Sequence, residues 1–133
     1  MGDFAQNGFV TTLHNFGTKS VQQFEEELKT FSGYRPMELI LPSLYSELEG
    51  PALKHIVEQI SQVDYISHVI IGLDKADKEQ FLHASHFFSK LNKPFSLLWN
   101  DGPRLRAIHD ELEDMQLAPT ELGKGRNVWY CIG

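Results

Sequence analysis

Three short apolar runs, each followed by a polar loop, constrain the fold of this chain more than any other feature. The runs cover residues 37–41, 66–71 and 95–99, and the loops cover residues 42–47, 72–77 and 100–104. Stretches of helical periodicity separate the runs, so we predict the order strand, helix, strand, helix, strand. An open parallel sheet of this kind binds ligands at the carboxyl ends of its strands. The polar loops therefore mark the expected ligand site.

Length, charge and cysteine content exclude several classes of protein. A chain of 133 residues fits one domain with a real core, and a formal charge of −6 argues against bulk binding of nucleic acid. No segment approaches the roughly 18 apolar residues of a membrane span, and the first residues lack the pattern of a signal peptide. The single cysteine, Cys131, rules out an internal disulfide and fits a cytoplasmic location. We expect Cys131 to be a buried packing residue.

Capping and turn residues predict where the helices begin. Ser20 and Gln23 have the spacing of a capping box, before a helix that Gly33 would end. Residues that favour helix starts predict four more helices, at Pro51, Asp77, Pro103 and near Gly125. We predict an N-terminal arm and helix in residues 1–35, the arm packing on the domain. Residues 36–133 are predicted to form a three-layer, Rossmann-like α/β domain with a parallel sheet.

Apolar residues recur at helical spacing in these segments and predict one apolar face on each helix. In the first helix they are Val21, Phe24, Leu28 and Phe31, and in the helix after Pro103 they are Leu105, Ile108, Leu112 and Met115.

The segment Gly123-Lys124-Gly125-Arg126 stands at the start of the last predicted helix. Glycines allow close approach of a ligand, and a helix N-terminus directs unpaired N–H groups at an anion. Lys124 and Arg126 add positive charge, so the segment is a candidate clamp for a diphosphate. It is not a P-loop and lacks the third glycine of a dinucleotide fingerprint. The structural alternative is a flexible surface turn with two solvated bases.

The three loops carry further candidates for binding. After the first strand, Pro42, Ser43 and Tyr45 precede Glu47, whose carboxylate can accept hydrogen bonds from a ribose or a base. Tyr45 could pack on a ring, or could simply cover the edge of the sheet. After the second and third strands, Asp74 and Asp101 face the same crevice. An ion pair between Asp101 and Arg104 is the structural alternative to ligand binding at that loop.

Other motifs point away from metal or nucleophilic catalysis within this chain. His83 and His86 could share a helix face, but no further ligand stands at a recognisable spacing. The chain has no Gly-x-Ser-x-Gly, no His-Glu-x-x-His and no Asp-x-Asp. Its last residues, 127–133, have the pattern of a buried helix that has only begun. We therefore expect the 133 residues to be part of a longer protein.

With these residues placed, the chain resembles the N-terminal half of a nucleotide-sugar glycosyltransferase of the GT-A fold. The similarity is to the glucosyl-3-phosphoglycerate and mannosylglycerate synthase type. It covers roughly residues 36–133 and depends on the order and spacing of three segments, residues 39–47, 70–74 and 123–129.

The resemblance implies roles for several residues. Pro42, Ser43 and Glu47 would line the pocket for the donor nucleoside, with Asp74 close to the base and Lys124 on the diphosphate. The first loop of such enzymes reads Pro-Ala-Leu-Asn-Glu-Glu, and the different residues here leave the base preference open. The metal-binding Asp-x-Asp of such enzymes lies beyond the last helix. Mg²⁺ or Mn²⁺ is thus expected for the full-length enzyme, and the fragment alone is expected to be inactive.

Two main hypotheses follow. In the first, the chain is the donor-binding half of an enzyme that transfers a sugar from a nucleoside diphosphate sugar to a small hydroxylated or phosphorylated acceptor. In the second, it is a complete, non-catalytic interaction module of flavodoxin-like layout, with its apolar C-terminus as the contact surface. A regulatory domain that binds nucleotide without a sugar is a third possibility.

Overall fold

The computed structural model describes residues 17 and 19–133. The elements are α1 (Val21–Tyr34), β1 (Met37–Leu44), a short 3-10 helix η1 (Tyr45–Glu49), α2 (Pro51–Gln62), β2 (Ile66–Asp74), α3 (Lys78–Phe88), β3 (Phe95–Trp99), α4 (Pro103–Asp114) and α5 (Lys124–Ile132). The predicted order of strands and helices is confirmed. The expected packing of an N-terminal arm on the domain concerns residues that lie outside the described part.

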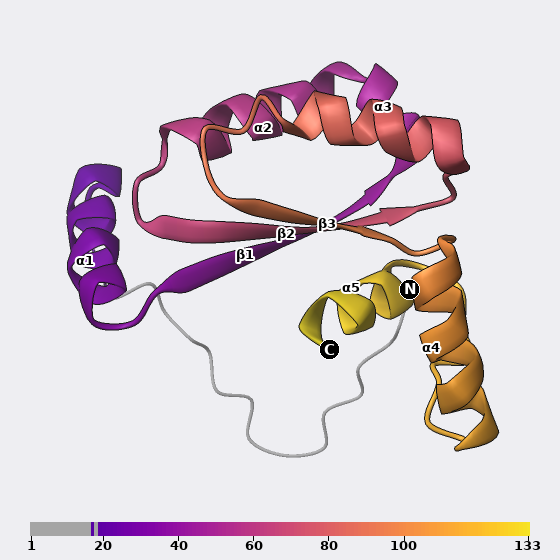
Figure 1. Cartoon of the computed structure of the whole chain (residues 1–133). Coiled ribbons are helices and arrows are strands. Elements are labelled where there is room, and N and C mark those ends of the chain that lie inside the picture. Colours follow the sequence, from indigo (N-terminus) through magenta and orange to yellow (C-terminus); the bar gives the residue numbers. More distant parts are fainter. Residues whose placement is uncertain (1–16, 18) are drawn as a thin grey trace, which may run out of the picture.

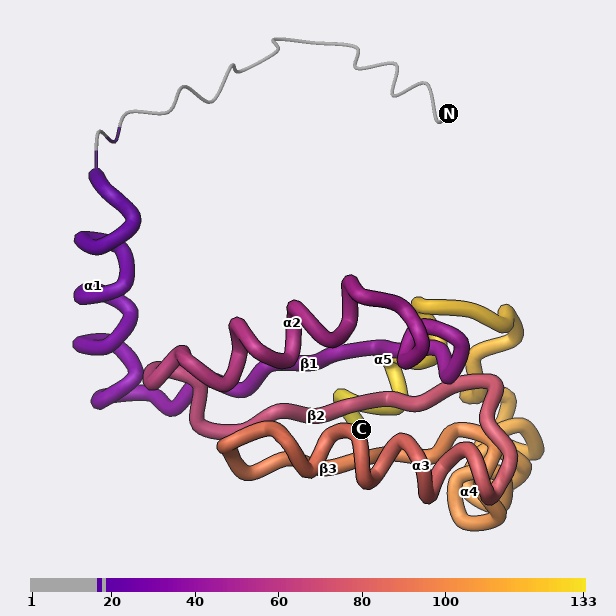
Figure 2. The backbone as a smooth tube through the Cα atoms, turned by 90° about the horizontal axis from the view of Figure 1, so that it is seen from above, coloured from indigo at the N-terminus to yellow at the C-terminus, as the bar shows by residue number. Residues whose placement is uncertain are grey.

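The sheet and its helices form three layers. The strands lie in the order β1-β2-β3, and both neighbouring pairs are parallel. In Figures 1 and 2, α2 and α3 cover one face of the sheet and α5 packs on the opposite face. This confirms the predicted three-layer, Rossmann-like α/β fold. A flavodoxin-like layout is wrong, because it places the first strand between the second and third, whereas β2 is central here.

The first two strands continue further than the sequence predicted. Pro42 pairs with Gly72 and Leu44 with Asp74, in residues that we expected to lie in loops. Both Pro and Gly are poor strand formers, so the local sequence predicts an early end. Proline is tolerated in β1 because this strand lies at the edge of the three-stranded sheet. The consequence is that Ser43 and Asp74 lie on ordered strand ends and not on loops.

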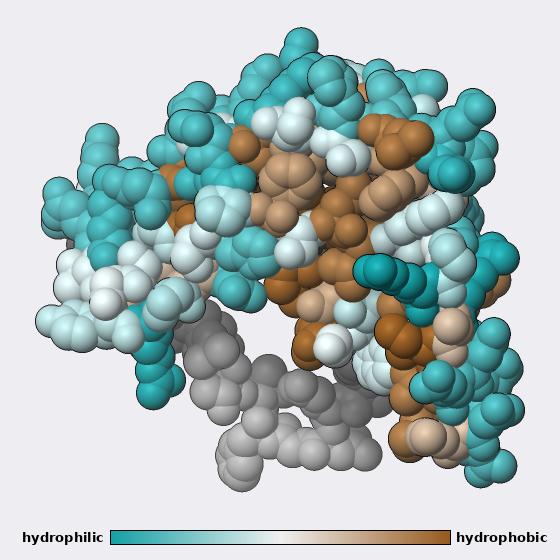
Figure 3. Space-filling model, in the orientation of Figure 1, coloured by the Kyte–Doolittle hydropathy of each residue, from teal (hydrophilic) through white to brown (hydrophobic). Residues whose placement is uncertain are grey.

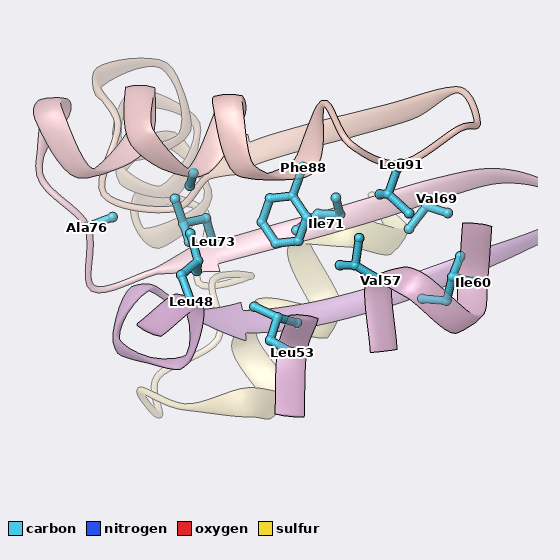
Figure 4. Close-up of a cluster of buried hydrophobic side chains, with 11 residues drawn as sticks. Leu48, Leu53, Val57, Ile60, Val69, Ile71, Leu73, Ala76, Phe88 and Leu91 are labelled. Carbon is cyan, nitrogen blue, oxygen red and sulfur yellow. The ribbon is translucent and has the colours of Figure 1, made fainter. Parts of the chain in front are cut away.

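The main hydrophobic core lies between the sheet and the pair α2 and α3 (Figure 4). Alternate residues of the central strand, Val69, Ile71 and Leu73, point into it and are fully buried, as is Phe88 of α3. Burial of each such side chain stabilises the fold by about 1.5–3 kcal/mol. The central strand is therefore held firmly on one side, and its other side is available to position α5.

Helix α5 is fixed to that other side by a buried polar contact. The Asn127 side chain is 3% exposed and donates a hydrogen bond from Nδ2 to the carbonyl oxygen of Gly72, 2.8 Å away. A Cβ atom on Gly72 would lie 1.8 Å from Asn127 Oδ1 and 2.7 Å from Cys131 Sγ. Only glycine allows α5 to approach β2 this closely. Cys131 is buried at this contact, which confirms the prediction for its packing.

Capping and helix ends agree largely with the sequence analysis. Ser20 with Gln23, and Asp77 with Gln80, form the capping boxes of α1 and α3. Helix α1 ends at Tyr34, one residue beyond Gly33, which we expected to end it. No helix of the described residues is long and apolar enough to cross a membrane.

The predicted apolar faces of α1 and α4 are largely exposed. Val21 and Phe31 of α1 are 73% and 61% exposed, and Ile108 and Met115 of α4 are 50% and 65% exposed. Figures 1 and 2 show α1 standing beside the amino-terminal ends of the strands, away from either sheet face. Figure 3 shows the apolar side chains of α4 at the surface. Periodicity predicted both helices correctly but not that these faces lack cover among the described residues.

We expect Gly72→Ala to destabilise the fold by about 1–3 kcal/mol, because the added methyl group forces Asn127 and Cys131 away from β2. Urea unfolding followed by circular dichroism measures the effect. Gly125→Ala in α5 is the matched control, since a Cβ there meets no atom within 4 Å. A variant at Gly72 as stable as the control would show that α5 is not docked as described.

Candidate ligand site at the carboxyl ends of β1 and β2

A cavity of about 220 Å³ opens where the carboxyl ends of β1 and β2 meet the start of α5, at the right-hand end of the sheet in Figure 1. It is lined by Pro42, Ser43, Leu44, Glu47, Asp74, Lys75, Gly123, Lys124 and Asn127. Segments from three distant parts of the sequence therefore converge at the edge of the sheet where parallel folds bind ligands.

The β1 side of the cavity presents a fixed carboxylate. Glu47 Oε2 accepts a hydrogen bond from the Leu44 backbone N–H at 2.9 Å and a longer one, 3.4 Å, from the buried Ser43 hydroxyl. Both bonds use the same oxygen, so Oε1 keeps its capacity to accept hydrogen bonds from a ligand. Glu47 is thus held in one orientation by its own loop, with one oxygen available.

The β2 side contains a buried ion pair. Asp74 Oδ1 lies 3.2 Å from a terminal nitrogen of Arg126, and the two side chains are only 5% and 16% exposed. The Arg126 guanidinium also lies over the Tyr130 ring, 5.8 Å from its centroid. Arg126 was predicted to help bind a diphosphate. The structure places it instead as the bridge that joins β2 to α5.

The start of α5 is prepared for an anion. Gly123 precedes the helix with a φ of 144°, a conformation that favours glycine, and no side chain caps the helix. The first turn contains no acidic residue. The N–H groups of this turn and the positive end of the helix dipole can therefore stabilise a negative group. Lys124 is exposed at this point and forms no ion pair with any described residue.

The structure brings five of the eight predicted site residues together and places three elsewhere. Pro42, Ser43, Glu47, Asp74 and Lys124 line the cavity, whereas Tyr45, Asp101 and Arg126 do not.

Tyr45 and Asp101, two of the three residues that do not line the cavity, form contacts elsewhere in the structure. The Tyr45 hydroxyl lies 3.0 Å from His83 Nδ1 of α3, and the Tyr45 side chain packs against the hydrophobic core. Tyr45 therefore has a packing role, although the structural alternative placed it at the edge of the sheet. Asp101 accepts a hydrogen bond from the Ala76 N–H at 3.1 Å. Its ion pair is with Arg106, at 3.8 Å, and not with Arg104, the partner named in the structural alternative, because the first turn of α4 brings Arg106 toward it.

Sequence reasoning did not select two residues that shape the site. Asn127 lines the cavity while holding α5 on Gly72, and Lys75, which directly follows β2, has a φ of 56°. The four-residue spacing from Gly123 to Asn127 places the asparagine one turn into the helix and could have indicated it. Nothing local distinguishes Lys75 from other lysines of the chain.

Neither a metal centre nor a reactive thiol is found at this cavity. The described residues contain no group of three or more His, Cys, Asp or Glu side chains that could hold a metal ion. Burial raises the pKa of the Cys131 thiol, which disfavours the nucleophilic thiolate. The groups that do line the cavity, namely the uncapped start of α5, Lys124 and the Glu47 carboxylate, suit recognition of an anion and of hydrogen-bonding groups.

Fold and site together define a class: a Rossmann-like α/β unit with a polar cavity at the carboxyl ends of its strands. Two curated relatives of the chain have the same name.

The chain is 41% identical over 133 residues to a glucosyl-3-phosphoglycerate synthase of Persephonella marina. It is 34% identical over 132 residues to a glucosyl-3-phosphoglycerate synthase of Methanococcoides burtonii. The resemblance to this type of enzyme is thereby confirmed.

These alignments cover 100% and 98% of the chain but only 33% and 32% of the two relatives. The chain thus spans about a third of the length of the curated relatives it matches. No protein-family model matches the chain, and no solved structure matches it significantly.

We expect Arg126→Met to destabilise the fold by about 3–5 kcal/mol, since it leaves the Asp74 carboxylate buried without a partner. The double variant Asp74→Asn, Arg126→Met should recover much of that loss. Urea unfolding of the two single variants and the double variant measures the coupling. The exposed pair Lys29 and Asp64 is the control, and its removal should change stability little. Additive losses at Asp74 and Arg126 would contradict the bridge.

For Cys131 we predict slow labelling by Ellman's reagent at pH 8 in the native state and fast labelling in urea. Burial both shields the sulfur and raises its pKa, so fewer thiolates are present than in the unfolded chain. Native labelling as fast as that of the unfolded chain would show that α5 does not cover the thiol.

Proposed function

We propose that the chain is the donor-binding part of a glycosyltransferase of the GT-A type. The complete protein would transfer a sugar from a nucleoside diphosphate sugar to a small hydroxylated or phosphorylated acceptor. The observation that carries this proposal is the convergence of Lys124, the uncapped start of α5 and the Glu47 carboxylate on one cavity. The relatives' shared name supports it.

Each wall of the cavity suits one part of the donor. The positive end of α5 and Lys124 would hold the diphosphate, and the free oxygen of Glu47 would accept a hydrogen bond from a ribose hydroxyl. Groups that stabilise the diphosphate also stabilise the negative charge that develops on it as the sugar departs. The chain would thus contribute binding and stabilisation of the leaving group.

The relatives' name indicates the sugar and the acceptor. We propose glucose as the sugar and 3-phosphoglycerate as the acceptor, because these are the two parts of the product after which the relatives are named. Mg²⁺ or Mn²⁺ stays an expectation for the full-length enzyme. The residues described here do not offer a group that fits such an ion, so no step of the reaction is derived through it.

Calorimetric titration of the chain with UDP, GDP, ADP and their glucose esters, with and without Mg²⁺ or Mn²⁺, tests the donor site. We expect one nucleoside diphosphate to bind and Lys124→Ala to weaken it about ten- to a hundredfold. This range corresponds to about 1.5–3 kcal/mol for a hydrogen bond to a charged group.

Lys54→Ala is the matched control, since Lys54 is an exposed lysine on α2, across the sheet from α5, and should leave binding unchanged. An equal loss of nucleotide affinity in Lys124→Ala and Lys54→Ala would mean that the net charge of the chain, and not the position of Lys124, determines binding. No binding by the folded chain would count against the donor site and in favour of an interaction module. Binding of a nucleoside diphosphate with no added affinity from any sugar would favour a regulatory nucleotide-binding domain.

A further inference from the structure

A second cavity lies at the carboxyl ends of β2 and β3, between those ends and the helices α4 and α5. Its volume is about 410 Å³. It is lined by Asp74, Lys75, Asn100, Asp101, Arg106, His109, Asp110, Leu122, Arg126 and Tyr130. Asp74 and Lys75 also line the donor cavity, so the two spaces share a wall formed by the end of β2.

Asn100 is the unexplained residue of this second cavity. It is 7% exposed, and neither Nδ2 nor Oδ1 of its side chain has a hydrogen-bond partner among the described residues. Its backbone N–H donates to the Leu73 carbonyl oxygen at 2.9 Å, which fixes the residue at the end of the sheet. A buried carboxamide without partners is costly and rare in native structures. A partner that the cavity admits would remove that cost.

The surrounding charges indicate what kind of partner this is. Asp74 is paired with Arg126, and Asp101 with Arg106, so the cavity is electrostatically balanced and does not favour a strong anion or cation. One of the two ring nitrogens of His109, Nδ1, is paired with the Tyr130 hydroxyl, 2.5 Å away.

The aromatic surroundings and the volume of the cavity further limit the kind of ligand that it could bind. The Tyr130 ring is covered by Arg126 and by the edges of His109 and Trp129, which leaves little aromatic surface on which a base could stack. The cavity volume of about 410 Å³ is far larger than the roughly 30 Å³ that one water molecule takes up in the liquid, so a compact ligand also fits there. An uncharged, polar and compact group remains.

We propose that this second cavity binds an uncharged vicinal diol, as found in sugars and polyols. Adjacent hydroxyl groups donate and accept hydrogen bonds side by side, which matches the Nδ2 donor and Oδ1 acceptor of Asn100. The Asp110 carboxylate and the Arg106 guanidinium at the rim add an acceptor and donors for further hydroxyl groups.

The ribose of a nucleotide also carries a vicinal diol, but the proposed function places that ribose at Glu47 in the donor cavity. Two sources of the same chemistry remain: the transferred sugar of a nucleoside diphosphate sugar held in the donor cavity, or a free polyol. The first source rests on the proposed function, and the second does not. The shared wall at Asp74 and Lys75 places the diol cavity next to the diphosphate site, as the first source requires.

The side-chain amide of Asn100 reports binding directly by ¹⁵N NMR of the chain. Its two proton signals are assigned by their loss in Asn100→Asp, which keeps the shape of the side chain. UDP, GDP, UDP-glucose, GDP-glucose, free glucose and glycerol are added in separate titrations. We expect these signals to shift with a glucose-containing ligand or with glycerol, and not with the nucleoside diphosphate alone.

Variants give a second readout. Asn100→Ala should weaken binding of the glucose-containing ligand about tenfold or more while leaving the affinity for the nucleoside diphosphate unchanged. Arg104→Ala, an exposed arginine of α4 outside this cavity, should leave both affinities unchanged.

The outcomes separate this proposal from the donor site. A shift with free glucose or glycerol, in a chain that binds no nucleotide, supports the diol cavity and contradicts the donor site. A shift of the Asn100 signals with UDP or GDP alone overturns the assignment of this cavity to the transferred sugar or a free polyol, because the nucleotide, whose ribose carries a vicinal diol of its own, would then occupy it. No shift with any of the six ligands also overturns it, and the cavity then holds water only.

Discussion

The contact between α5 and the central strand β2 is the interaction on which the rest of the site depends. Gly72 allows the helix to approach, and Asn127 binds the Gly72 carbonyl oxygen at 2.8 Å. One residue earlier in α5, Arg126 forms an ion pair with Asp74 at 3.2 Å. Without these two contacts the start of α5 would not face the ends of β1 and β2. The start of α5, which we propose binds an anion, would then be only an exposed turn.

The Asp74–Arg126 pair also divides the polar end of the sheet into two spaces. Asp74 belongs to the walls of both cavities, and Arg126 belongs only to the second. The first space has unpaired positive character from Lys124 and the helix dipole, whereas the second has balanced charges and an unpartnered carboxamide. This difference is why we assign an anion to one and a neutral, hydroxylated group to the other.

Local signals in the sequence predicted the elements and their order well. Ser20 and Asp77 each form capping hydrogen bonds with a residue only three positions later in the sequence. The sequence therefore indicated the capping box at Ser20 and the helix start at Asp77, and the structure contains a capping box at both. The ends of β1 and β2 were placed too early because Pro42 and Gly72 discourage strands locally, while pairing between the strands overrides that preference. Five of the eight candidate residues meet at the cavity because the carboxyl ends of parallel strands lie at one edge.

The features that the sequence did not predict are mainly contacts between residues and elements that local patterns do not link. Asp74 and Arg126 are 52 residues apart, and no local pattern indicates that they form a pair. The structural alternative for Asp101 named Arg104 as its partner, but the partner is Arg106, since helical geometry decides which side chain turns toward the loop. Periodicity also could not show that the apolar faces of α1 and α4 lack cover among the described residues, because it identifies a face but not its partner.

Hydrogen–deuterium exchange of the chain, with and without a saturating nucleoside diphosphate, tests the central claim most directly. The claim is that the backbone N–H groups at the start of α5 hold an anion. We predict that exchange slows at the amides of Lys124, Gly125 and Arg126, which no side chain caps. Slowing confined to β3 and α4 would contradict the account, as would unchanged exchange at α5 under conditions in which calorimetry detects bound nucleotide.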